Sequence, residues 1–338
     1  SNATVTLSSA ATDINASGVP KAINQASTHG ITLGSNTNIA STTITNPNAL
    51  TLGNNVTATM TQAQHNAFSA ISAAGSGEQI TLTTAGAVTG ASSIETYVLA
   101  NGNQTFTLGA VGQNVTTGTG NVTINAAGTL AGTLNGTNST TTLNITADSD
   151  IRGVTLTSIE AITLAAGVDI TATRAIADLI TTASGTNIVT LTDPGALTGK
   201  AQVETYVLAN GNQTFTLGAV GQNVTTGSGD VTINAAGTLT GTLNGTSGGT
   251  VTLNLTGASV LSGTLTAIDA ISLASSATAT MTVAQNGTIS AAAGSNTVTL
   301  SDSGTTDATG NANVAAYVLG DGNQTFTLGA VGQNVTTG

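Results

Sequence analysis

The chain has no cysteine and no tryptophan among its 338 residues, and aromatic residues make up only 2% of it. The lack of cysteine excludes disulfides and thiolate metal sites. With so few aromatic residues and only 6% charged residues, an ordinary globular enzyme is not expected. Four Lys and Arg stand against 15 Asp and Glu, for a formal net charge of −11. Because binding to phosphates requires basic side chains, nucleic acid and anionic membranes are not expected as partners.

Long apolar segments are also missing. No stretch approaches the roughly 18 to 20 continuous apolar residues of a membrane helix, and no basic segment followed by an apolar one opens the chain as in a signal peptide. We therefore expect no membrane insertion in this segment. Ser1, Asn2 and Ala3 match the remnant of a cleaved expression tag. The absence of cysteine fits a bacterial exported protein.

The sequence does contain long internal repeats. The segment GNQTFTLGAVGQNVTTG occurs three times without a change, starting at Gly102, Gly211 and Gly322, so the period is 109 and then 111 residues. A second pattern, an apolar residue followed by an acid and then by alternating apolar residues, starts at 94, 159, 203 and 268 and more weakly at 314. Its spacings of 65, 44, 65 and 46 residues divide each repeat into a longer and a shorter half.

Within the longer half, apolar residues return every nine or ten positions between short alternating segments bounded by Gly and Asn. This spacing predicts an all-β fold, a parallel β-solenoid with two strands per coil and about 16 coils. The inward residues are predicted to include Phe106, Val115, Ile124, Phe215, Val224 and Ile233. We expect one continuous solenoid: tag residues 1–3, a divergent first unit at 4–96, repeat units at 97–205 and 206–316, and a truncated unit at 317–338.

Three segments interrupt the shorter halves with different lengths, at 60–75, 174–185 and 281–294, so each is expected to leave the core. The first predicts a short helix, capped by Thr59 or Thr61. The residues at helical spacing in this first segment are Met60, Gln64, Ala67, Phe68 and Ile71. In the third segment Gly287 favours a loop or a single turn instead.

One stretch carries a resemblance to a known family. GDGNQTFT at 320–327 resembles the nonapeptide G-G-x-G-x-D-x-U-x of haemolysin-type calcium repeats. Together with the Thr-Gly-Asn bias and the Ile-Glu-x-Tyr/Ile-x-Leu strands, it makes the chain similar to the large repetitive exoproteins of Gram-negative bacteria, such as surface adhesins and S-layer-like proteins. The resemblance implies an extracellular or cell-surface location. At the calcium-binding Asp this chain instead has Gln104, Gln213 and Gln324, and Val122 and Val231 stand at the next comparable turn.

Acidic residues recur at the start of the entry strands, at Glu95, Glu160, Glu204 and Asp269. We expect each carboxylate to accept backbone N–H bonds at a corner and so to fix the register of its coil. The alternative is weak calcium binding by stacked corner oxygens, which needs six to eight ligands. Asp230 and Asp321 are further calcium candidates, although Asn stands at the matching positions of other copies. No other cofactor is expected.

Catalytic groups are sparse. The two histidines, His29 and His65, do not recur in the repeats, so a solvent or loop role is expected for them. Asp148 and Asp150 form the only close acidic pair, and Arg152 beside them favours a turn held by a local ion pair. β-Helix glycosidases and lyases need clustered acids or basic residues in a groove, which this sequence does not show.

These observations predict a non-enzymatic structural or adhesive repeat segment of a large bacterial surface or secreted protein, acting as a spacer or interaction surface. Its partner would be carbohydrate or another cell-surface protein. The alternatives are a carbohydrate-active β-helix enzyme, a calcium-binding solenoid, and an ice-binding solenoid with outward Thr rows. The change from nine to ten residues after Ile124 argues against a regular Thr lattice.

Overall fold

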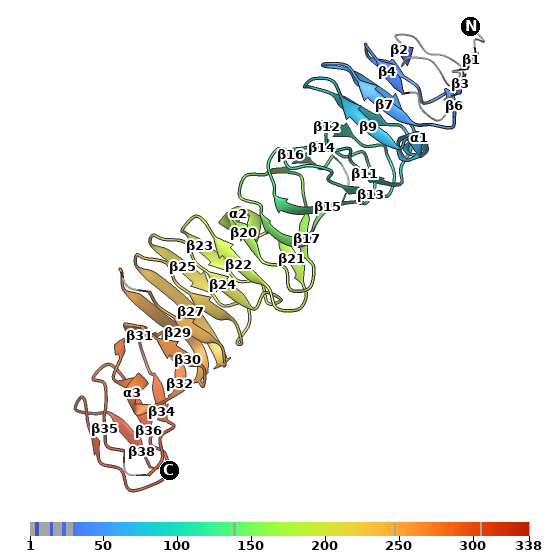
Figure 1. The fold of residues 1–338 in the computed structure, drawn as a ribbon. Helices are drawn as coiled ribbons and strands as arrows, with labels where there is room; N and C mark the ends of the chain where they lie inside the picture. The colour runs from blue at the N-terminus through green and yellow to red at the C-terminus, as the bar shows by residue number, and fades with distance from the viewer. Residues whose placement is uncertain are drawn as a thin grey trace. The chain divides into compact units, whose positions relative to one another are not determined.

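The computed structural model describes residues 4–6, 14–15, 22–24, 30–137, 140–246, 248–304 and 306–337. Tag residues 1–3 and His29 lie outside these ranges. The described chain is almost entirely β-structure, and its strands pair in parallel, as predicted for a β-solenoid (Figure 1). It forms two compact units, Ser1–Val168 with Leu179–Thr182 and Asp169–Asp178 with Ala183–Gly338. The expectation of one continuous solenoid with the boundaries given above stays a prediction.

The first unit is a solenoid whose successive coils add parallel strands to the same sheets. One sheet contains β5 (Thr37–Asn38), β8 (Thr57–Met60), β10 (Gln79–Leu82), β12 (Thr96–Val98), β14 (Asn114–Thr116), β16 (Thr133–Asn135) and β18 (Thr155–Thr157). A second contains β11 (Ala87–Thr89), β13 (Gln104–Thr107), β15 (Val122–Thr129), β17 (Thr141–Asp150), β19 (Ala161–Leu164) and β21 (Ile180–Ala183). The remaining strands are β1 (Thr4–Thr6), β2 (Ile14–Asn15), β3 (Ala22–Asn24), β4 (Ile31–Leu33), β6 (Thr43–Thr45), β7 (Ala49–Leu52) and β9 (Ala70–Ala73).

The second unit is built in the same way. One of its sheets contains β20 (Ile170–Ala172), β22 (Ile188–Leu191), β24 (Thr205–Val207), β26 (Asn223–Thr225), β28 (Thr242–Asn244) and β30 (Thr264–Thr266). Another contains β23 (Ala196–Thr198), β25 (Gln213–Thr216), β27 (Val231–Leu239), β29 (Val251–Leu261), β31 (Ala270–Leu273), β32 (Thr278–Met281), β33 (Ile289–Ala292), β34 (Thr297–Leu300), β36 (Ala316–Val318) and β38 (Asn334–Thr336). A short pair is formed by β35 (Ala308–Thr309) and β37 (Phe326–Thr327).

The core of each unit is a set of stacked apolar rows. In the first unit Phe106 pairs with Ile124, and Ile124 pairs with Leu143 on the next coil. Side chains alternate across each strand, so the Thr residues between these apolar positions face outward. All six residues predicted to point inward are buried, which confirms that prediction.

Several strands are longer than the short ones that the sequence predicts. β15, β17, β27 and β29 have 8 to 11 residues. The extra length contains a break in register between Ala126 and Gly128, and again between Ala235 and Gly237. Both glycines have a positive φ, 79° and 86°, which favours glycine. The bulge lets the strand turn while pairing continues beyond it.

Three short helices interrupt the described solenoid coils: α1 (Gln62–Ala67), α2 (Arg174–Ala177) and α3 (Val283–Asn286). α1 is shorter than the helical spacing suggests, because Met60 ends β8 and Ile71 lies in β9. Its N-cap is Thr61, one of the two predicted caps. α3 is a single turn ending at Gly287, which confirms that expectation. No helix within the described ranges has the length and apolar character needed to cross a membrane.

Candidate functional site

Four acidic side chains hold neighbouring coils together, and we call Glu95, Glu160, Glu204 and Asp269 the corner carboxylates. Each accepts a hydrogen bond from a backbone N–H on the preceding coil, as the sequence predicts. The donors are Glu78 (3.0 Å), Thr141 (2.6 Å), Asn187 (2.8 Å) and Val251 (2.8 Å), in the same order. The side chains of all four donor residues are fully buried. A carboxylate at this position therefore satisfies an amide that water does not reach.

The other two calcium candidates lie at different corners. Asp230 Oδ1 accepts a hydrogen bond from Thr250 N at 2.9 Å, and its own N–H donates to Asn212 Oδ1 at 3.0 Å. Asp321 has an exposed side chain, and its backbone carbonyl accepts from Gly304 N at 2.9 Å. Within the described part of the chain, no three His, Cys, Asp or Glu side chains gather where they could hold a metal ion. The structure thus distributes the six candidates along the coils, and calcium binding by them stays a prediction.

The glutamines at the calcium position of the nonapeptide bind backbone carbonyls. Gln104 Nε2 donates to Ala100 O at 2.5 Å, and Gln213 Nε2 donates to Ala209 O. Val122 and Val231, at the next comparable turn, are buried in the core. At these positions the chain has amides and apolar groups that support the fold.

A second set of glutamines has a structural role that the sequence reasoning missed. Gln113 Oε1 accepts from Gly109 N at 2.7 Å, while its Nε2 donates to the carbonyls of Ala91 at 2.7 Å and Ile94 at 2.8 Å. The same three bonds recur around Gln222 and Gln333. The unchanged GAVGQNV sequence in all three copies was the available signal for this bridge.

A groove of about 520 Å³ lies beside α1. His65 on this helix is buried, with only 5% of its surface exposed, so the expected solvent or loop role is wrong. Its Nε2 lies 3.3 Å from the Tyr97 hydroxyl and its Nδ1 lies 3.2 Å from Asn66 Oδ1. Burial lowers the pKa of His65, which favours the neutral ring. The groove lining also includes Phe68, Thr89, Thr105 and Thr107.

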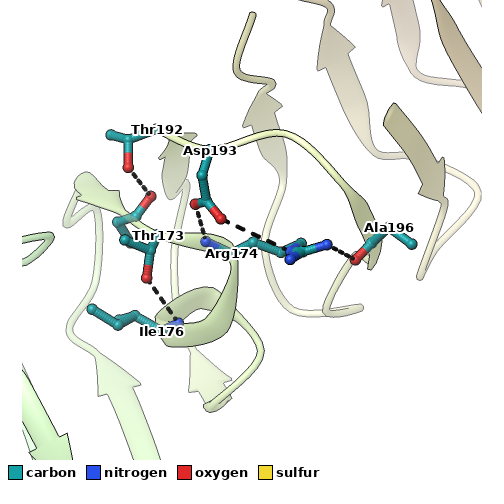
Figure 2. A network of polar contacts seen from close by, with 7 residues as sticks. Thr173, Arg174, Ile176, Thr192, Asp193 and Ala196 are labelled. Atoms are coloured by element: carbon teal, nitrogen blue, oxygen red, sulfur yellow. Dashed lines mark hydrogen bonds and ion pairs between the residues drawn. The ribbon is translucent and has the colours of Figure 1, made fainter. Parts of the chain in front are cut away.

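The matching groove beside α2 has a different chemistry, because charged side chains line it. Figure 2 shows the polar contacts of Arg174 at this helix. Arg174 N donates to Asp193 Oδ1 at 2.7 Å, its Nε lies 4.0 Å from Asp193 Oδ2, and its Nη1 donates to Ala196 O at 3.4 Å. Lys200 Nζ forms an ion pair with Asp178 at 2.7 Å. This cavity of about 380 Å³ is lined by Arg174 and Asp178 and by the neutral residues Ala175, Ala196, Leu197 and Thr198.

One member of the acidic pair singled out in the sequence, Asp150, forms a local ion pair with Arg152. Asp150 Oδ2 lies 2.9 Å from Arg152 Nε, and its Oδ1 accepts from Arg152 N at 3.2 Å. This arrangement matches the expected turn.

Comparisons with known proteins give no relative for this chain. No family model matches it, and no curated protein and no solved structure is significantly similar to it.

Proposed function

We propose that the chain is a non-enzymatic structural and adhesive repeat segment of a large bacterial cell-surface or secreted protein. The observation that carries this proposal is what the unchanged repeat residues do. Phe106 and Phe215 fill the core, and Gln113 and Gln222 bridge neighbouring coils through backbone groups. The identical residues are thus used to build the scaffold. A repeat that preserved a reaction would instead preserve a cluster of reactive side chains.

The interaction surface in this proposal is the set of helices that leave the coils. They occupy matching places in the repeat, but α1 flanks an uncharged groove with His65, and α2 flanks a charged one with Arg174 and Asp178. Segments that vary on a constant scaffold are where binding specificity is commonly found. We expect carbohydrate or another cell-surface protein to bind there.

The experiment measures adhesion of beads coated with the purified protein to immobilised polysaccharides and glycoproteins. We expect adhesion to at least one of them, and its reduction in the double variant Arg174→Ala/Asp178→Ala or in Asn66→Ala. Thr157→Ala, an exposed position in strand β18 that lines neither groove, serves as the control. Beads that adhere to nothing, or variants that adhere as well as the control, would contradict the adhesive role.

A second assay tests the non-enzymatic part of the proposal. The protein is incubated with acidic and neutral polysaccharides, and reducing ends and unsaturated sugars are measured. We expect no release. Product formation that disappears in Asp148→Asn or Asp150→Asn would show that the chain is a polysaccharide-degrading enzyme.

A further inference from the structure

One corner carboxylate has an acidic neighbour that is buried. Glu78 is 0% exposed, and neither of its carboxyl oxygens has a hydrogen-bond partner. Its backbone N–H donates to Glu95 Oε2 at 3.0 Å. Two acidic residues therefore share one corner of the first unit, and the buried carboxyl oxygens of one of them have no hydrogen-bond partner among the described residues.

The third copy of the repeat shows what this position requires. Asn296 precedes β34 as Glu78 precedes β10, and it is also fully buried. Its Nδ2 donates to the backbone carbonyls of Ala274 at 2.7 Å and Ala277 at 3.2 Å. In the first copy, Gly53 and Val56 stand at the positions of these two carbonyl-bearing residues, Ala274 and Ala277. The fold thus presents acceptors to this side chain, and an ionised Glu78 has no hydrogen to donate.

Among the residues that the structure describes in the first unit, no Lys or Arg side chain is free to compensate this charge. The only Lys or Arg among the described residues of the first unit is Arg152, which pairs with Asp150 at 2.9 Å. Burial raises the pKa of Glu78, and the neighbouring Glu95 raises it further. An isolated buried carboxylate is strongly unfavourable. The compensating positive charge must therefore come from solution, as a proton or as a metal ion.

A divalent cation compensates the negative charge of Glu78 and Glu95 more completely than a proton does. One proton held between the adjacent carboxyls of Glu78 and Glu95 neutralises one of the two negative charges and leaves the other. A divalent ion bound by both carboxylates balances both charges. Carboxylate, carbonyl and water oxygens are the ligands that calcium takes. A cavity of about 310 Å³, lined by Gly75, Ser92, Ser93 and Glu95 among others, opens on the Glu95 side of this corner.

We propose that Glu78 and Glu95 form a calcium-binding site in the first unit. The site lies outside the nonapeptide positions, where this chain has glutamine and valine. It is specific to this corner, because the amides held by Glu160, Glu204 and Asp269 belong to Thr141, Asn187 and Val251, none of which is acidic. The proposal does not depend on the adhesive role.

The test is calorimetric titration of CaCl₂ into the metal-free protein at pH 7, together with melting curves with and without millimolar CaCl₂. We expect one calcium ion per chain and a higher melting temperature. Glu78→Asn introduces the residue of the sister copies, so the fold is retained, and calcium affinity should fall at least tenfold. Glu78→Gln is a second variant with the original side-chain length, and Glu204→Gln is the matched control that should bind as the unmodified chain does.

Three results would overturn the proposal. The first is no calcium binding by the unmodified protein. The second is unchanged binding by both Glu78 variants, which would place the ion elsewhere. The third is a melting temperature that rises toward acidic pH and does not respond to calcium, which would assign the corner to a bound proton.

Discussion

Glu204 reaches the backbone amide of Asn187 on the preceding coil, with 2.8 Å between Oε2 and N. In the opposite direction, the amide of Thr205 donates to the carbonyl of Asn187 at 3.1 Å. The side chain thus adds one hydrogen bond directly beside the parallel ladder. An acid at this position fixes which residue of one coil faces which residue of the next, so the recurring carboxylates have a structural explanation.

Removing this carboxylate should destabilise the second unit. Glu204→Ala leaves the buried amide of Asn187 without an acceptor, so we expect the free energy of unfolding to fall by about 1 to 3 kcal/mol. Glu204→Gln keeps an acceptor oxygen and should cost less. Urea denaturation followed by circular dichroism measures both. Equal stability of the Ala variant and the unmodified protein would show that the bond contributes nothing.

The core position of Phe215 predicts a larger effect. Its ring is buried and packs against Tyr206, with 4.9 Å between ring centroids. Phe215→Ala should lower the free energy of unfolding by about 3 to 5 kcal/mol, because it leaves a cavity in a thin core. Phe215→Leu fills part of that space and serves as the control. A neutral Phe215→Ala would mean that this side chain does not support the core.

Close approach of neighbouring coils predicts the effect of glycine substitutions. A Cβ on Gly218 would overlap the backbone carbonyl of Gly199, whereas a Cβ on Gly257 would meet only Ala236 Cβ at 3.7 Å. Gly218→Ala should therefore cost about 1 to 3 kcal/mol through overpacking, and Gly257→Ala should be nearly neutral. The midpoints of thermal unfolding give the comparison. Equal midpoints for both variants and the unmodified chain would show that close approach of the coils at Gly218 does not limit the side chain there.

His65 predicts a pH dependence of the first unit. Burial lowers its pKa in the folded state, while the unfolded chain binds the proton near the ordinary value of about 6.5. The unfolded state therefore takes up more protons, and stability present above pH 6.5 is lost as the pH falls below it. In the third copy Asn286 takes this place and accepts from the Tyr317 hydroxyl at 2.9 Å.

His65→Asn is accordingly the matched variant for this prediction. Melting temperatures measured between pH 7 and pH 5 should fall more steeply for the unmodified protein than for the variant. Parallel curves would show that His65 does not titrate differently in the folded and unfolded states.

Much of the fold could be predicted from the sequence, because a thin solenoid core depends on local alternation and repeat spacing. Phe106, Val115 and Ile124 recur every nine residues. Parallel stacking places Phe106 and Ile124 in one row, whereas Val115 pairs with Leu134 in the other sheet. The recurrence of an acid at one position of the motif likewise indicated that the corner carboxylates accept backbone N–H bonds. These signals work because each coil meets only its neighbours.

Other features depend on geometry that residue spacing does not contain. The bulge at Gly128 adds length to a strand without changing the apolar pattern around it. On the outer face Asn144 Nδ2 donates to Asn125 Oδ1 at 2.9 Å. That bond requires the two strands to be in register, which the sequence does not show. His65 is buried because Tyr97 lies beneath it, although 32 residues separate them.

Thermal unfolding in excess chelator tests most directly the claim that the chain's own contacts hold its coils together. In metal-free buffer at pH 7 we predict a β-type circular dichroism spectrum and a cooperative melting transition. Millimolar calcium should raise the melting temperature only by the contribution of the Glu78 and Glu95 corner. Loss of the folded spectrum in chelator, restored by calcium, would contradict the account and show that the corner carboxylates are obligatory metal ligands.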